Sequence, residues 1–293
     1  MTDQNLRQKA IALYDHFTHI GMDRRAFMAD LTKLAGSATA ANALLMAIAG
    51  NPAAAAIVPA DDARLKAQDI EWPVAGGRTM KGYWASPAGA KGKLPAVIVI
   101  HENRGLTEHI RDVTRRMALE GFIAVAPDFL SPAGGTPTDE DKARTMIGAL
   151  VLAESIADGA ATVTWLKGDT RTNGKVGVTG FCWGGAMTEN IAVSAGSALA
   201  AAVPYYGPAP DPAQAAKVKA AMLLQFAETD DRVNKTAQPW IDALKAANVP
   251  VEAYFYPGTQ HAFNNDTSVE RYNKAAANLA WSRTIAHFRK YLK

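Results

Sequence analysis

A chain of 293 residues, 48% hydrophobic and 20% charged, has the size and composition of a globular α/β protein with one central sheet. Its formal net charge of +3 comes without a basic block and without interleaved aromatic and basic residues, which argues against a nucleic-acid-binding protein. The single cysteine excludes an intrachain disulfide and a cysteine-rich metal site.

Residues 1 to about 60 differ from the rest of the chain. The sequence Arg24-Arg25-Ala26-Phe27-Met28 is followed by an Ala-rich apolar run over 31–50, and then by the small residues of 51–56. This order resembles a twin-arginine export signal, which would place the protein in the periplasm. Polar residues such as Asn42 interrupt the apolar run, so no membrane span is expected.

A second interpretation of the same segment stays open. A long stretch precedes Arg24, and in it Ile11, Tyr14, Phe17 and Ile20 recur at about three-residue spacing. Such spacing is typical of the apolar face of an amphipathic helix. The segment would then be a helical extension that packs on the body of a cytoplasmic protein.

From about residue 67, strands and helices alternate. Two strands at 70–74 and 80–84 flank Gly76-Gly77 and predict a hairpin. Buried strands are predicted at 94–100, 122–126, 175–179, 199–203, 221–226 and 251–256. Helices are predicted at 107–120, at 139–167 in one or two pieces, from Trp183, after each of the last two strands, and finally at 268–291. This alternation predicts one α/β domain over 61–293, with a mainly parallel sheet, helices on both faces and an antiparallel edge.

The sequence Gly180-Phe181-Cys182-Trp183-Gly184-Gly185 lies between a predicted strand and a predicted helix. It has the Gly-x-nucleophile-x-Gly spacing of a nucleophile elbow, with cysteine in place of serine. Glycines are needed on both sides because Cβ atoms there would collide with neighbouring backbone. The elbow places the sulfur at a helix N-terminus, where the peptide dipoles favour the thiolate. A lone cysteine is usually a small buried hydrophobe, but this context predicts a nucleophile.

An elbow predicts an acid and then a histidine at the ends of later strands. Asp230 and Asp231 follow the strand at 221–226, and His261 follows the strand at 251–256. Parallel strands bring these loops to the same edge of the sheet as Cys182. His261 could then exchange a proton with the thiol, while a carboxylate fixes the tautomer of the imidazole.

Over about residues 67–292 the chain resembles the dienelactone hydrolase (carboxymethylenebutenolidase) family of α/β-hydrolases. The elbow, Asp230 and His261-Ala262-Phe263 match the family, as do Asn173-Gly174-Lys175-Val176-Gly177 and Tyr205-Tyr206-Gly207. The resemblance implies an α/β-hydrolase fold. It also favours Asp230 over Asp231 as the orienting acid, because Val233 three residues later suits the spacing of the family.

The resemblance implies further roles around the sequence His101-Glu102-Asn103-Arg104-Gly105. Glu102 would hold the resting thiol and accept its proton when substrate displaces it. The backbone N–H groups of Trp183 and Asn103 would form the oxyanion hole, each contributing roughly 3 kcal/mol. The substrate pocket would be lined by Arg104, Tyr206 and Phe263.

The chain departs from the family at the substrate carboxylate. Type members of the family bind this group with two arginines, whose positions fall here on Asn265 and near Glu140, with Arg144 one turn away. The resemblance therefore supports the catalytic residues around the thiol more strongly than it supports dienelactone as the substrate.

The sequence thus predicts a thiol-dependent hydrolase that cleaves a small lactone or activated ester through a thioester, without a cofactor or a metal ion. Two alternatives stay open: a broad esterase or acyltransferase with another substrate, and a catalytically silent small-molecule-binding protein of the same fold. The oligomeric state is left open.

Overall fold

A computed structural model describes residues 3–50 and 56–293. The predicted cleavage-site stretch lies almost wholly outside the described residues, at 51–55. The chain divides into two compact units. The helical unit comprises residues 1–54 with 263–277, and the sheet unit comprises 55–262 with 278–293.

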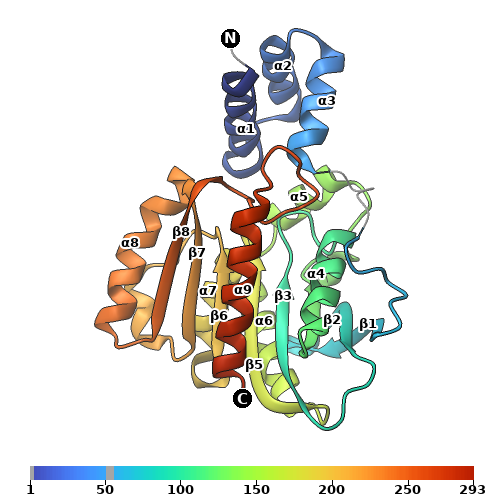
Figure 1. The fold of residues 1–293 in the computed structure, drawn as a ribbon, viewed down its shortest axis with the longest axis vertical. Coiled ribbons are helices and arrows are strands. Elements are labelled where there is room, and N and C mark those ends of the chain that lie inside the picture. Colours follow the sequence, from blue (N-terminus) through green and yellow to red (C-terminus); the bar gives the residue numbers. More distant parts are fainter. Residues whose placement is uncertain (1–2, 51–55) are drawn as a thin grey trace. The chain divides into compact units, whose positions relative to one another are not determined.

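The helical unit contains helices α1 (Asp3–Ile20), α2 (Arg24–Ala35) and α3 (Ala38–Ala49) (Figure 1). The predicted amphipathic face of α1 is buried at Ile11, Tyr14 and Phe17, and the side chain of Ile20 lies outside the described residues. Phe17 stacks on Phe27 of α2 with ring centroids 4.3 Å apart. The N-terminal segment is therefore helical, with an apolar core of its own.

The second segment of this unit, 263–277, is hydrogen-bonded to the N-terminal helices. Ser268 Oγ donates to the carbonyl of Ile48 over 2.6 Å, and the guanidinium of Arg271 lies 3.7 Å from the Asp15 carboxylate. Ser268 is fully buried and Arg271 almost so. These buried polar contacts join two parts of the chain that are more than 200 residues apart in sequence.

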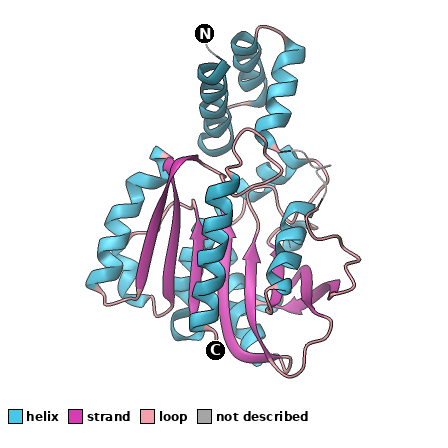
Figure 2. Ribbon diagram, in the orientation of Figure 1, coloured by secondary structure: helices cyan, strands magenta, loops and turns pink. Residues whose placement is uncertain are grey.

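The sheet unit is built on one sheet of eight strands in the order β1-β2-β4-β3-β5-β6-β7-β8. Figure 2 shows the strands in magenta, with cyan helices around them. The strands β3 to β8 pair in parallel, and the hairpin of β1 and β2 adds the predicted antiparallel edge. The strands are β1 (Leu65–Pro73), β2 (Thr79–Pro87), β3 (Leu94–Ile100), β4 (Ile123–Asp128), β5 (Thr172–Phe181), β6 (Ala201–Tyr205), β7 (Ala221–Thr229) and β8 (Val251–Gln260).

Helices cover both faces of this sheet. In the view of Figure 1, α4 and α9 lie in front of the strands, while α6 and α7 lie behind them. The helices are α4 (Glu108–Leu119), α5 (Glu140–Gly148), α6 (Leu152–Gly168), α7 (Trp183–Ala195), α8 (Asp231–Ala246) and α9 (Lys274–Tyr291). Central strands such as β3 are buried on both faces, which explains their continuous apolar sequence. The architecture confirms the predicted mixed α/β fold.

Two predicted boundaries are corrected. The last helix begins at Lys274 instead of residue 268, because Ser268 takes part in turns: its carbonyl accepts from Tyr272 N–H, and Asn273 N–H bonds to Phe263. The strand predicted at 199–203 runs over Ala201–Tyr205, since Leu199 ends a short 3₁₀ turn. The long helix of 139–167 is two helices, α5 and α6.

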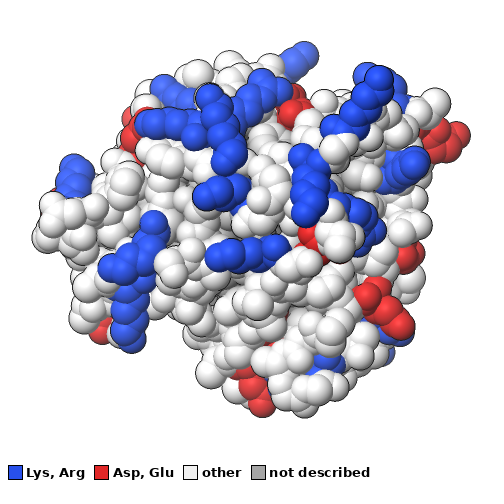
Figure 3. All heavy atoms as spheres, turned by 90° about the horizontal axis from the view of Figure 1, so that it is seen from below, with Lys and Arg blue, Asp and Glu red and all other residues white. Residues whose placement is uncertain are grey.

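Basic side chains gather at the amino edge of the sheet, the face seen in Figure 3. The helices that return from the carboxyl edge end there, and their last turns carry Arg116, Lys167, Lys245, Arg289 and Lys290. A cation at a helix C-terminus interacts favourably with the aligned peptide dipoles. The helix dipoles therefore explain why these basic side chains lie at the amino edge of the sheet.

Among the described residues, no single helix is long and apolar enough to cross a membrane, although two sharply bent helix pairs, α2 with α3 and α5 with α6, meet that test together.

Candidate active site

The sheet unit places Cys182 in a strained turn between β5 and α7. Its backbone angles are φ 56° and ψ −111°, an unfavourable region for a residue with a side chain. A Cβ on Gly180 would lie 2.2 Å from the Gly184 carbonyl oxygen, and one on Gly184 would lie 2.5 Å from the His101 carbonyl oxygen. The neighbouring backbone therefore demands glycine on both sides of Cys182.

Hydrogen bonds hold the backbone of Cys182 in this conformation. Its N–H donates to the Tyr205 carbonyl over 3.1 Å, and its carbonyl accepts from Ala186 N–H over 3.1 Å. The side chain is 6% exposed. Because α7 begins at the next residue, the sulfur stands at the positive end of a helix dipole, where a thiolate is favoured.

His261 follows β8 and is oriented by Asp230. The His261 Nδ1 atom lies 2.6 Å from Asp230 Oδ2, and both side chains are buried. Asp230 also caps α8, since its other carboxylate oxygen accepts from Val233 N–H over 3.4 Å. Asp231, the neighbouring candidate, is exposed as the first residue of α8. The structure thus brings His261 together with Asp230.

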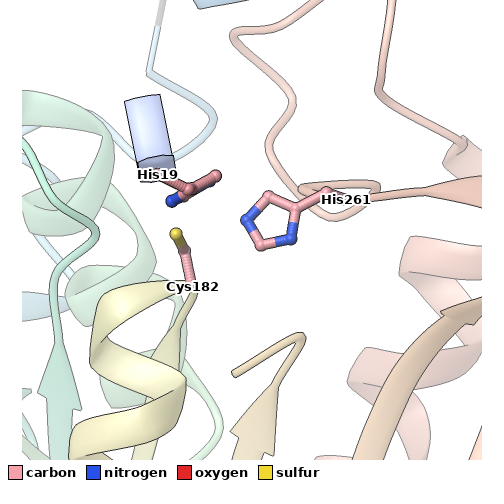
Figure 4. Close-up of side chains that lie close together, drawn as sticks. All are labelled: His19, Cys182 and His261. Atoms are coloured by element: carbon pink, nitrogen blue, oxygen red, sulfur yellow. The ribbon is translucent and has the colours of Figure 1, made fainter. Parts of the chain in front are cut away.

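The sulfur of Cys182 and a ring nitrogen of His261 lie within 4.8 Å of each other. Because Nδ1 bonds to Asp230, the nitrogen left for the sulfur is Nε2, and Figure 4 shows a ring nitrogen of His261 on the side of Cys182. His19, also labelled there, belongs to α1 of the helical unit. Cys182 and His261 are both residue types that can ligate a metal ion.

The electrostatics of this group favour a charged imidazole. Burial lowers the pKa of His261, but the negative charges of Cys182 and Asp230 outweigh burial and raise this pKa to about 10. Burial raises the pKa of Asp230, but the charge and hydrogen bond of His261 lower it below its usual value. The surroundings of His261 therefore favour the protonated form of its imidazole.

The loop after β3 carries the other predicted site residues. Glu102 and Asn103 are half-buried there. Arg104 forms a short ion pair with Glu140 at the start of α5. This pairing bears on substrate binding, because Glu140 stands near the place where the resemblance puts a carboxylate-binding arginine of the family. Arg144 is 3.7 Å from Asp141 in the same helix.

The predicted pocket residues Tyr206 and Phe263 fall in different units. Tyr206 has a φ of 37° and is almost fully buried, and the edge of its ring meets the His261 ring with centroids 5.1 Å apart. Phe263 is fully buried and belongs to the helical unit, as does Asn265, whose side-chain oxygen accepts from the Thr267 N–H over 3.0 Å. The structure brings Tyr206, but not Phe263, into the sheet unit beside His261.

Sequence reasoning missed His101. The sequence pattern assigns His101 no role, because His101 does not follow either of the strands that carry the acid and the base. In the structure its ring is fully buried and stacks on the Trp183 indole, directly after Cys182. The one available sequence signal was its place at the carboxyl end of a buried strand, beside Glu102.

Comparisons with known proteins cover most of this chain. Residues 80–292 match the dienelactone hydrolase family. A protein of Escherichia coli strain K12, provisionally named carboxymethylenebutenolidase, is 34% identical over 258 residues, which cover 83% of this chain and 94% of that protein. A provisionally named carboxymethylenebutenolidase of Methylorubrum extorquens is 30% identical over 91% of this chain and 98% of its own length.

A solved structure from Klebsiella pneumoniae, provisionally described as a dienelactone hydrolase, has a TM-score of 0.68 and 31% sequence identity, covering 77% of this chain and all of the other. The match over residues 80–292 includes both the elbow at Cys182 and the Asp230–His261 pair. The protein is a hydrolase that acts on esters or lactones, and the chain belongs to the dienelactone hydrolase family.

Proposed function

We propose that this protein hydrolyses a small lactone or activated ester through a thioester on Cys182, with His261 as the acid–base group and Asp230 as its orienting carboxylate. One observation carries this proposal. A sulfur in a strained elbow lies within 4.8 Å of an imidazole whose other nitrogen is 2.6 Å from a buried carboxylate. Such an arrangement activates a nucleophile and fixes the tautomer of its base.

The first half-reaction begins from the thiolate–imidazolium pair. The sulfur attacks the carbonyl carbon, an S–C bond forms, and the carbonyl electron pair moves to oxygen. The N–H groups of Trp183 and Asn103 would stabilise that oxyanion. When the tetrahedral adduct collapses, the C–O bond breaks, and the alkoxide or enolate takes the proton of His261.

The second half-reaction returns the enzyme to its starting state. Neutral His261 removes a proton from water as the water oxygen attacks the thioester carbon. The C–S bond then breaks, so the acid leaves and the thiolate faces the imidazolium again. A thiolate expels a stabilised enolate more readily than a simple alkoxide, which favours enol lactones and activated esters as substrates.

Residues beside Cys182 and His261 would support this reaction. Glu102 would hold the thiol in the resting enzyme and take its proton when substrate enters, which forms the thiolate–imidazolium pair. Glu102 would return this proton to the sulfur after the product leaves. Arg104 and Tyr206 would contact the substrate. Because Arg104 is already paired with Glu140, its charge is compensated before a substrate binds. We therefore expect a lower requirement for a substrate carboxylate than in type members of the family.

The test is hydrolysis of dienelactone, simple lactones and p-nitrophenyl esters by the wild type, Cys182→Ala and Cys182→Ser. Loss of every activity in both variants, with folding retained by circular dichroism, supports the thiol mechanism, and the rates in the wild type then define the substrate class. Activity on esters alone would favour the broad esterase. Wild type without turnover, or activity that survives Cys182→Ala, would favour a binding protein or another nucleophile.

A further inference from the structure

The ring of His101 connects three elements that meet at the carboxyl edge of the sheet. The Nδ1 atom lies 2.7 Å from the carbonyl oxygen of Glu102, after β3. The Nε2 atom accepts from the backbone N–H of Phe129, after β4, over 3.2 Å. The face of the ring stacks on the indole of Trp183, at the start of α7, with centroids 5.3 Å apart and planes 9° apart.

The protonation state of this ring is determined by its two backbone partners. A backbone N–H can only donate, so Nε2 must carry a lone pair toward Phe129. A carbonyl oxygen can only accept, so Nδ1 must carry the proton toward Glu102. An imidazolium would place two N–H groups against each other at Phe129. Burial lowers the pKa of His101, against the opposing charges of Glu102 and Asp128, so the ring is neutral as this geometry requires.

These contacts surround the two backbone N–H groups, of Trp183 and Asn103, that the proposed mechanism assigns to the oxyanion hole. Trp183 is held on one side by His101 and on another by the edge of the Phe129 ring, with centroids 5.4 Å apart. The carbonyl that His101 contacts belongs to Glu102, the residue directly before Asn103. The backbone of α7 at Gly184 also lies close to the backbone of His101, since a Cβ on Gly184 would lie 2.5 Å from the His101 carbonyl oxygen.

We propose that neutral His101 is a positioning residue, which holds the Trp183 and Asn103 N–H groups at the spacing that an oxyanion needs. The inference rests on the proposed function, because it assigns those two N–H groups to the oxyanion. The effect of His101 is on the transition state, where a donor displaced by about 1 Å can reduce the rate 100-fold.

Two substitutions separate the two kinds of contact. His101→Phe keeps an aromatic ring for Trp183 but cannot accept from Phe129 N–H. His101→Gln keeps a donor and an acceptor but loses the stacked ring. His287→Gln is the matched control, because His287 is a buried imidazole that hydrogen-bonds the carbonyl of Ala221 at the opposite, amino edge of the sheet.

The readouts are kcat and KM on the best ester or lactone substrate, together with the rate at which iodoacetamide alkylates Cys182. Alkylation needs the thiolate but forms no oxyanion. We expect both His101 variants to lower kcat by about 10-fold to 100-fold, with KM and the alkylation rate within about threefold of wild type. The control should retain wild-type kcat.

Wild-type kcat in both His101 variants would overturn the inference, as would a parallel loss of kcat and alkylation, which would indicate damage to the thiol or the fold. If His101→Phe does not fold, the smaller change His101→Gln decides alone. A wild type without turnover would instead refute the proposed function, so the two failures are distinguishable.

Discussion

The charge on His261 depends on Cys182 as well as on Asp230. Burial alone lowers the pKa of this imidazole, and the two neighbouring anions raise it to about 10. In Cys182→Ser the hydroxyl is neutral, so the contribution of Cys182 to the raised pKa of His261 is lost. We therefore expect the pKa of His261 to fall toward its ordinary value of about 6.5. Titration of the imidazole resonances by NMR measures this shift, and an unchanged pKa near 10 would contradict a contribution of Cys182 to the pKa of His261.

Asp230 and Asp231 are adjacent in sequence but differ in their surroundings. Asp230 is buried and bonds His261, whereas Asp231 is exposed on α8. Asp230→Asn would present an amide to Nδ1 and favour the wrong tautomer, so we expect kcat to fall by roughly 10²-fold to 10⁴-fold. Asp231→Asn should stay within about twofold, as is usual for an exposed position. Equal losses in the two variants would contradict the assignment of Asp230.

At the scale of elements, the elbow depends on the close approach of α7 to β3. Gly184→Ala would place a Cβ 2.5 Å from the His101 and Ile100 carbonyl oxygens, and backbone atoms cannot rotate away. We expect the free energy of unfolding to drop by about 2 kcal/mol or more, together with loss of activity.

Gly148 in α5 differs from Gly184 in that it has room for a side chain. A Cβ there meets nothing within 4 Å, so Gly148→Ala should leave stability unchanged or raise it by up to about 1 kcal/mol through helix propensity. Thermal and urea unfolding of the two variants measure the difference. Equal stability of Gly184→Ala and the wild type would show that the elbow can relax.

The elements that could be predicted from sequence are those with a simple local pattern. The strand at 94–100 is apolar throughout because both of its faces are buried, and the elbow shows the spacing that sterics impose on Cys182. The start of α9 could not be predicted, because Ser268 is kept out of the helix by turns and by a hydrogen bond to Ile48. A contact over 220 residues leaves no local pattern.

The site could be predicted where topology alone brings residues together. Parallel strands carry Cys182, Asp230 and His261 to one edge, so their order in the chain was sufficient. The pairing of Arg104 with Glu140 and the stacking of His101 on Trp183 depend on the paths of loops and on side-chain orientation. Neither is encoded in the spacing of residues along the chain.

At the scale of the whole molecule, the N-terminal segment has two interpretations that make different predictions. As a helical extension, it supplies the partners of two buried residues, Ser268 and Arg271. Deletion of residues 1–54 would leave these polar groups without Ile48 and Asp15. We expect a Tm lower by several degrees.

Differential scanning calorimetry of the full chain, the truncated chain and Arg271→Gln tests this prediction. The single substitution removes only the contact with Asp15, so its effect should be the smaller one. A truncated protein with the Tm of the full chain would instead favour an export signal that is dispensable for the folded enzyme.

The most direct test of the thiol mechanism is the mass of the enzyme during turnover. Wild type mixed with p-nitrophenyl acetate and quenched in acid within the first turnover should gain one acetyl group, located on Cys182 by peptide mapping. His261→Ala should gain it more slowly, and Cys182→Ala should gain none and hydrolyse nothing. Acetyl on another residue, or hydrolysis by Cys182→Ala, would contradict the assignment of Cys182 as the nucleophile.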